Sequence, residues 1–412
     1  MVSPNIQWVL ENLSKHTERD ALADDGGPLI GINQLTGQAG AFYEKLRYLV
    51  DYKEEHTIRR SAIARILKRQ LLVEGEERIG LSLLQELVGG GYLANKSVPE
   101  SLAEEVQAIV NKYLLLGADI GNFKLANIMA SEIERMLYPQ TVNDLVAEAF
   151  CTTVLRHMKF ADPIPEEEAR IQTYIACRRA LLEDDRDTLL YAVLITYLPE
   201  LPKLSDENEI EQTREQFSRA MREAAAELEN PLGWKIASRL KNHAIYFSVI
   251  REIIKKYGAM SETVLTDNAR LDEEIKKFLG ERYHHQHKVA QRSGTRAVIY
   301  ILLTKIILGV AVELPYEKFV LNSIDYVALG TNILFHPLLL LGMVKTIRSP
   351  GSRNTNLIIS GVRGIVHNEN QKPVYITSSH SSLLSLLVFG FLHNVVRSKL
   401  RTRFARTRCA AL

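Results

Sequence analysis

Apolar side chains recur at helical spacing along most of this chain, and the alternation of period two that is typical of strands is almost absent between residues 41 and 283. The glycine run at 89–91 ends one predicted helix, and Pro99 begins the next. Because no repeat of fixed length is found, the pattern predicts an all-α fold, either a multi-helix bundle or an irregular helical solenoid. Further helices are predicted over residues 119–137, 141–159, 165–183, 186–198, 205–229 and 231–257.

Two apolar arms joined by a polar turn follow this helical body. The first arm reads RAVIYILLTKIILGVAVEL from Arg296, and the second reads YVALGTNILFHPLLLLGMVK and ends at Lys345. Each arm has about 18 to 20 mostly apolar residues, the length that an α-helix needs to cross a hydrocarbon core. A soluble helix of that length would show a polar stripe. The arms therefore predict a transmembrane helical hairpin, and the alternative is a helix pair buried inside a large soluble domain.

Three polar residues interrupt the arms: Lys305 in the first, and Asn332 and His336 in the second. Asn332 and His336 are spaced i, i+4 and share a helix face. Folding the hairpin about residue 320 brings Lys305 level with residue 335, so a contact between Lys305 and His336 or Asn332 is predicted. Polar groups inside a membrane are expensive and are candidates for function. The contact has two possible roles. It would form a site that handles protons or ions in an oligomer, or it would be a structural hydrogen bond between the two helices.

Changes in this pattern divide the chain into five predicted segments. The clearest break inside the body is PELPK at residues 199–203, and a short charged helix before the hairpin is expected to end near Gly280. The segments are a lead-in (1–40), the first part of the helical body (41–203), a second part made of long helices (204–287), the transmembrane hairpin (288–345) and a basic segment (346–412).

The basic segment has elements of its own. Ile358, Val362, Ile365 and Val366 fit one helical face, and VYIT at 374–377 predicts a short strand. A last apolar run over residues 381–396 is short for a membrane span, which favours an interfacial or re-entrant helix over a third crossing. Its basic end would lie on anionic lipid, through Arg397, Lys399, Arg401, Arg403, Arg406 and Arg408.

Charge is divided unevenly along the chain. Residues 288–412 hold 16 Lys and Arg but four Asp and Glu, whereas the preceding residues hold 35 basic and 45 acidic side chains. An acidic body joined to a basic, apolar tail suits a lipid bilayer as partner. Nucleic acid is disfavoured, because the basic residues interleave with apolar runs rather than with aromatic side chains.

Orientation follows from the same charges. Basic residues flank both arms and the connecting loop is acidic, which predicts that both flanks and the body are cytoplasmic at a cell membrane. No signal peptide is recognised at the N-terminus. The three cysteines are far apart and form no CxxC pair, which is consistent with a reducing compartment.

Catalytic motifs are not recognised, so no catalytic residue, cofactor or metal ion is predicted. The histidines of YHHQH, residues 283–287, lack the partner spacing of a zinc site. Adjacent carboxylates such as Asp184 and Asp185 are interpreted as solvated helix faces. The arginine-rich face that includes Arg59 and Arg60 could meet phosphate or lipid headgroups, but a solvated face is the favoured interpretation.

The stretches LLTKIILGVAVELPYE and NILFHPLLLLGMVKTIRSPGSRNT resemble uncharacterised bacterial membrane proteins that have a large helical body and a C-terminal transmembrane segment. The resemblance implies no activity or ligand. The leading hypothesis is a membrane-anchored scaffold or adaptor whose cytoplasmic body binds a protein partner. The alternatives are an oligomeric membrane protein that handles ions or small solutes, and a membrane-tethered enzyme with an unrecognised site.

Overall fold

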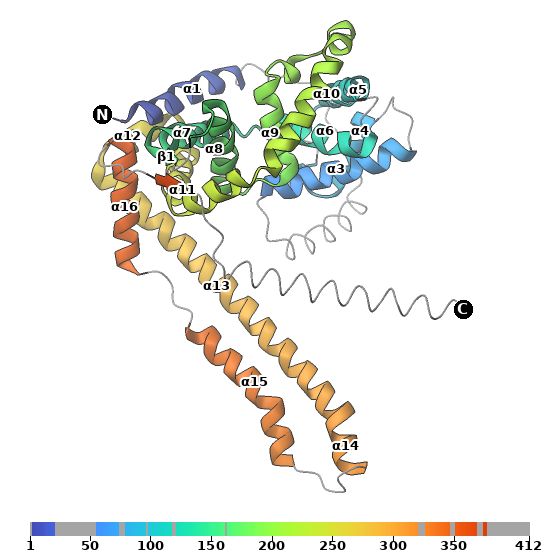
Figure 1. Cartoon of the computed structure of the whole chain (residues 1–412), viewed down its shortest axis with the longest axis vertical. Coiled ribbons are helices and arrows are strands. Elements are labelled where there is room, and N and C mark those ends of the chain that lie inside the picture. The colour runs from blue at the N-terminus through green and yellow to red at the C-terminus, as the bar shows by residue number, and fades with distance from the viewer. Residues whose placement is uncertain are drawn as a thin grey trace.

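The computed structural model describes residues 2–20, 55–73, 79–95, 98–117, 121–160, 163–319, 326–346, 351–368 and 374–376. Nearly all of these residues are helical, which confirms the predicted all-α class. Figure 1 shows a helical body from which a long helical hairpin projects, and a helix that returns from the hairpin to the body.

The body helices follow the predicted order closely. Their bounds are α1 (Pro4–Asp20), α3 (Glu55–Val73), α4 (Ile79–Gly89), α5 (Ser101–Leu116), α6 (Asn122–Leu137), α7 (Thr141–His157), α8 (Glu166–Leu181), α9 (Arg186–Tyr197), α10 (Glu207–Glu229), α11 (Pro231–Tyr257) and α12 (Ser261–Thr266). Short 3₁₀ turns at Leu201–Lys203 and Gly258–Met260 join some of them.

Capping side chains explain where several of these helices begin. Asp185 accepts a hydrogen bond from the backbone N–H of Thr188 at the start of α9, and Asp206 does the same for the first turn of α10. Asn230 caps α11, whose first residue is proline. Such side chains satisfy backbone donors that have no partner within the helix. Gly258 takes a positive φ of 52° directly after α11, where glycine is favoured.

The body contains two hydrophobic cores, and the helices that form them can be followed in Figure 1. The first lies among α3, α4, α5, α6, α9 and α10, where the rings of Tyr113 and Phe217 meet edge to face at 5.9 Å. The second lies among α1, α7, α8, α11 and the helices that follow, where Phe150 and Phe247 lie 4.5 Å apart. The chain passes between the two cores several times, so neither core is one continuous stretch of sequence. The PELPK break lies in the first core, where Leu201 is buried.

Two details differ from the predicted helices. The end of the helix predicted over 141–159 is a three-residue strand, β1 (Met158–Phe160), which pairs in parallel with β2 (Val374–Ile376). The strand predicted at 374–377 is therefore confirmed. The helix expected to end near Gly280 instead continues to Leu308 as α13 (Asn268–Leu308). A single glycine costs a helix only about 1 kcal/mol relative to alanine, and a long helix tolerates that.

The hairpin is not a C-terminal element, which corrects the predicted architecture. After its second arm, α15 (Tyr326–Thr346), the chain returns to the body through α16 (Ser352–Val366). The predicted apolar face of α16 is buried in the second core, because the surfaces of α11 and α13 cover it. The helix predicted over residues 381–396 and the basic residues that follow it, Arg397 to Arg408, lie outside the described residues.

Candidate functional site

The hairpin is the part of the molecule that differs most from an ordinary soluble domain. Its first arm continues from α13 through a π-helical turn (Gly309–Glu313) into α14 (Leu314–Phe319). Pro315 explains this turn, because it has no N–H to offer the carbonyl of Ala311 and its ring would clash there. The most apolar windows of the two arms have mean hydropathies of 2.2 and 1.2, and 6% of each window is buried. Both helices are long and apolar enough to cross a membrane.

The apolar side chains of the hairpin point outward. Among the described residues, 18 of the 25 exposed large apolar side chains belong to the hairpin, so its surface is unlike that of the body. Phe335 on α15 is 56% exposed, and Val327 is 79% exposed. Figure 1 shows the two arms extending away from the body, with no body helix packed along their outer length. In the described part of the chain, the two arms are therefore not buried as a helix pair in a core would be.

Glycines set the distance between the two antiparallel arms. A Cβ on Gly294 would lie 2.6 Å from the methyl groups of Val344, and a Cβ on Gly309 would lie 3.0 Å from the Ile333 side chain. Small residues at these points let two helix backbones approach closely, as in helix pairs packed inside membranes. The arms pair along most of their length, with Gly294 beside Val344 near the body and Gly309 beside Ile333 further out.

The three polar residues predicted to meet inside the hairpin are not joined in the structure. Asn332 Nδ2 donates instead to Glu313 Oε1 at 2.5 Å, a partner that the sequence did not single out. The His336 ring packs edge to face against Phe335 at 5.5 Å. No hydrogen bond or ion pair links Lys305 to Asn332 or His336 in the described part of the chain. Glu313 is the last residue of the π-helical turn. The extra residue in that turn changes which side of the first arm faces α15.

Both ends of the hairpin are fixed to the body. The first turns of α13 bury Leu271, Ile275 and Leu279 in the second core. Arg363 on α16 forms an ion pair of 2.7 Å with Asp272 on α13, and Asn354 donates to the Tyr283 hydroxyl at 2.7 Å. These contacts hold the returning helix against the outgoing one, so the hairpin projects from a rigid base.

A stalk separates this base from the apolar arms. Residues 280–296 of α13 lie between the last buried core residue, Leu279, and the start of the first apolar arm. At 1.5 Å of rise per residue, the stalk is about 25 Å long. The histidines of YHHQH are on it, and His287 Nε2 accepts a hydrogen bond from the Gln291 amide Nε2 at 2.9 Å. No group of three or more His, Cys, Asp or Glu side chains among the described residues could hold a metal ion.

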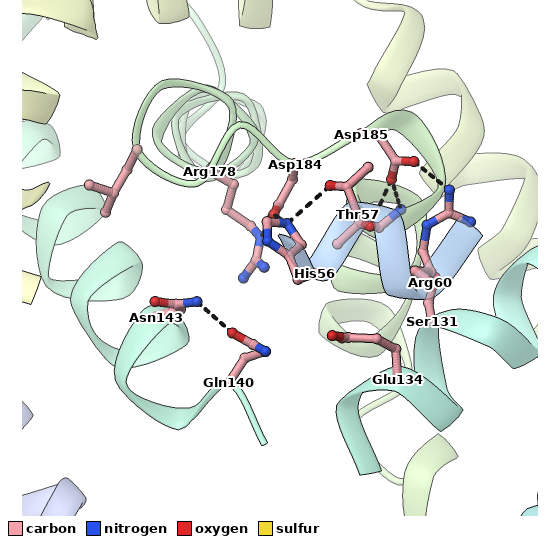
Figure 2. Close-up of polar contacts among 12 residues, drawn as sticks. His56, Thr57, Arg60, Ser131, Glu134, Gln140, Asn143, Arg178, Asp184 and Asp185 are labelled. Carbon is pink, nitrogen blue, oxygen red and sulfur yellow. Dashed lines mark hydrogen bonds and ion pairs between the residues drawn. The ribbon is translucent and has the colours of Figure 1, made fainter. Parts of the chain in front are cut away.

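A second candidate is a buried polar network between the two cores. Figure 2 shows side chains of α3 pointing toward the loop between α8 and α9. Asp184 in that loop accepts from Arg178 Nε at 2.6 Å and pairs with His56 Nε2 at 2.9 Å, and its side chain is 1% exposed. Burial alone would raise the pKa of Asp184, but the charges of Arg178 and His56 outweigh it and lower the pKa. Arg178 also pairs with Asp144 on α7 at 2.7 Å.

This network corrects the prediction of solvated faces. Arg60 is 5% exposed and forms ion pairs with Asp185 and Asp187, and Arg59 pairs with Glu134 at 3.1 Å. Burial raises the pKa of Glu134 despite the opposing charge of Arg59. No local pattern predicts this burial, because a run of arginines on a helix has the same spacing whether the arginines face water or carboxylates from distant helices.

The network has the residue types of a hydrolase but not the geometry. Thr57 Oγ1 lies 3.3 Å from His56 Nε2, and Asp184 Oδ1 contacts that same ring nitrogen. In a catalytic triad, one imidazole nitrogen of the histidine contacts the nucleophile, and the other nitrogen contacts the carboxylate that orients the ring. Threonine activation by a histidine relay is therefore not supported here. The network instead joins α3, α7 and the α8–α9 loop where the two cores meet.

No family model matches this sequence, and neither the curated proteins nor the solved structures searched contain a match. The exposed hairpin, the base that carries it and the surfaces of the body are therefore the features that bear on function.

Proposed function

We propose that this protein is a membrane-anchored helical scaffold or adaptor, whose hairpin crosses a bilayer and whose body binds a protein partner on the cytoplasmic side. The observation that carries the proposal is the exposed apolar surface of both arms. Apolar area exposed to water costs about 25 cal/mol per Å² relative to an apolar surrounding. A hydrocarbon core provides that surrounding for the hairpin, as the body's own cores do for the other apolar helices.

Charge at the hairpin ends supports the orientation. Lys288, Arg292 and Arg296 precede the first apolar arm, and Lys345 and Arg353 follow the second. Positive residues close to membrane helices favour the cytoplasmic side. The body, which carries both ends, is then cytoplasmic. We include in this proposal the resemblance of the hairpin sequence to uncharacterised bacterial membrane proteins.

The rigid base supports the role of a scaffold. The helix α13 runs without a break from the second core into the first arm, and α16 packs against α13. The body therefore has a fixed orientation relative to the proposed bilayer. The stalk contacts α16 through Tyr283 and then continues for 13 residues, about 20 Å, to Arg296, which separates the body from the start of the apolar arm.

Alkaline carbonate extraction of membranes tests the anchor. The full chain is expected to remain with the membrane pellet. The control is a variant that lacks residues 295–343 and joins Gly294 to Val344 by a short glycine linker, because these two residues already lie side by side. This variant keeps α16 in place over the second core, and it is expected in the supernatant. Extraction of the full chain by carbonate would overturn the proposal.

Cysteine labelling tests the orientation. In a Cys409→Ser background, Phe319→Cys places a thiol at the far turn, where the side chain is 77% exposed, and Lys288→Cys places one at the stalk. A membrane-impermeant maleimide is expected to label the far turn in intact cells and the stalk only after permeabilisation. The reverse pattern would contradict the cytoplasmic body.

A further inference from the structure

A pocket of about 860 Å³ opens between α8, α11 and α13, where α13 leaves the body to become the stalk. Four of its cationic or potentially cationic side chains come from three helices: Arg179 from α8, Lys241 from α11, and Arg282 and His285 from α13. Two carboxylates also line it, Glu183 and Glu252. The sequence does not indicate this pocket, because its lining residues are spread over more than one hundred positions, from Arg179 to Gln286.

The pocket lining carries more positive than negative charge, because four Arg and Lys side chains line it together with two carboxylates. Arg251, a fifth basic residue of the lining, pairs with Glu252 at 3.0 Å, so these two charges cancel. No carboxylate among the described residues forms an ion pair with Arg179, Lys241 or Arg282. Cations that converge on one concave surface without carboxylate partners create a positive potential that attracts anions.

Two of the guanidinium groups are held in place by other contacts. Arg282 Nη1 donates to the hydroxyl of Ser248 at 3.0 Å. Arg179 Nη2 donates to the carbonyl of Leu228 at 3.0 Å, and the guanidinium carbon lies 4.0 Å from the ring centroid of Trp234. Burial lowers the pKa of Arg179, against the weaker opposite influence of Glu229. A guanidinium that is already fixed loses less conformational entropy when it binds an oxyanion.

We infer that this pocket binds a phosphate-bearing ligand. Arginine and lysine together supply planar and point-charge donors that suit phosphate oxygens. Two sources share this chemistry, the headgroup of an anionic phospholipid and a soluble phosphate compound. His285 precedes Arg296 by 11 residues, about 16 Å along the helix, which places the pocket on the side of the body that faces the proposed bilayer. The lipid source rests on the proposed function, and the soluble source does not.

Tryptophan fluorescence provides a direct test, since the chain has two tryptophans and Trp234 lines the pocket. In a Trp8→Phe background, Trp234 becomes the single reporter. It is 62% exposed and stacked by Arg179, so an anion that moves Arg179 should change its emission. The full chain in detergent is titrated with inorganic pyrophosphate at constant ionic strength, with chloride as the comparison salt. A saturable change with pyrophosphate and none with chloride is expected.

Matched substitutions decide whether the pocket is responsible. Lys241→Gln is expected to raise the Kd for pyrophosphate about tenfold, because a hydrogen bond to a charged group is lost. Lys235→Gln removes the same charge from the same helix but outside the pocket lining, and it should leave the Kd unchanged. Lys241 is exposed and has no hydrogen bond or ion pair among the described residues, so its loss should not disturb folding. Equal effects of the two substitutions would overturn the assignment.

Nanodiscs separate the two sources of phosphate. The Trp8→Phe chain is placed in phosphatidylcholine nanodiscs with and without phosphatidylglycerol. A change in Trp234 emission that requires phosphatidylglycerol and Lys241 identifies the lipid headgroup, whereas a response to pyrophosphate alone identifies a soluble ligand. Absence of both responses refutes the inference. Failure of the chain to enter nanodiscs counts against the membrane anchor but leaves the detergent titration valid.

Discussion

The body and the hairpin contain the same apolar residue types, but the body buries these side chains and the hairpin exposes them. In α4 of the body, Leu83, Leu84 and Leu87 are at most 1% exposed, whereas Leu334 and Leu338 of α15 are at least half exposed. The helices of the body have polar stripes that face water, and their apolar stripes meet in two cores. The arms of the hairpin have almost no polar stripe, so two such helices cannot cover each other completely. The comparison shows that the described part of the chain covers the apolar side chains of the body but leaves those of the hairpin exposed.

Charged groups show the same contrast. Lys112 in the first core is 3% exposed, and its Nζ lies 2.5 Å from Glu132 Oε1 and 3.0 Å from the carbonyl of Leu201. Lys305 on the hairpin has no such partner among the described residues. A buried charge inside a protein needs a fixed partner. A lysine on a membrane helix can instead extend its flexible chain toward the interface.

The largest expected difference between the two regions comes from a matched pair of phenylalanines. Phe247→Ala should lower the free energy of unfolding of the body by about 3 to 5 kcal/mol, because the ring is 1% exposed and packs against Phe150. Phe335→Ala, on the hairpin, should change it by less than about 0.5 kcal/mol. Urea unfolding in detergent, followed by circular dichroism, measures both. Equal losses would mean that the hairpin is part of the cooperative fold.

The next effect concerns the polar network between the cores. Arg178→Met should destabilise the body by about 3 kcal/mol, because it leaves the buried carboxylate of Asp184 without its main partner. Arg186→Gln breaks a pair with Glu229 in which both side chains are more than half exposed, and it should cost less than about 1 kcal/mol. The same urea titration compares them. A small effect of Arg178→Met would show that the network is not needed to join the cores.

Two carboxylates of that network should give opposite responses to pH. The pKa of Asp184 is lowered in the folded state, so its contribution is fully present above the unfolded pKa of about 3.9 and is lost as pH falls through the lower folded pKa. The pKa of Glu134 is raised by burial, so its protonation favours the folded state as pH falls through the folded pKa.

Substitutions separate these two contributions. Asp184→Asn should destabilise the body at pH 7, and the difference from the parent protein should shrink in strong acid. Glu134→Gln should be tolerated at pH 7 and should remove the stabilising response that protonation of Glu134 gives as pH falls. Urea midpoints measured between pH 2 and pH 7 test both expectations, and matching slopes for the two variants would contradict the assigned directions.

The smallest effect is expected at the contact between the arms. Gly294→Ala places a methyl group against Val344 and should push the arms apart locally, whereas Gly330→Ala adds a methyl group where no other atom lies within 4 Å. Spin labels on cysteines at Lys288 and Lys345, in a background without other reactive thiols, report the separation. A widening of about 1 to 2 Å is expected for the first variant alone, the scale on which packed helices shift past each other. No difference between the variants would mean that this contact does not set the spacing.

Much of the local structure could be predicted from the sequence. Helix positions depend on residues three or four apart and on caps such as Asp206 and Asn230, all within one stretch of chain. The buried face of α16 was predicted for the same reason. The length and apolarity of the two arms, and hence the hairpin as a candidate anchor, also follow from local pattern. The helix boundary expected at Gly280 was wrong, since a glycine permits a helix end but does not require one.

The long-range arrangement was decided by tertiary structure alone. Arg60 and Asp185 are 125 positions apart, and nothing near either residue indicates that they meet in a buried network. Three other features also depend on contacts between residues that are distant in the sequence. They are the return of α16 to the body, the hydrogen bond between Asn332 and Glu313, and the basic pocket beside the stalk. Each depends on which surfaces pack together, and packing depends on the shape and charge of distant segments at once. The sequence by itself determined the helices and the apolar arms, because those depend on neighbours along the chain. Only the folded structure determined which faces are buried, which charges are paired and which are left free to bind.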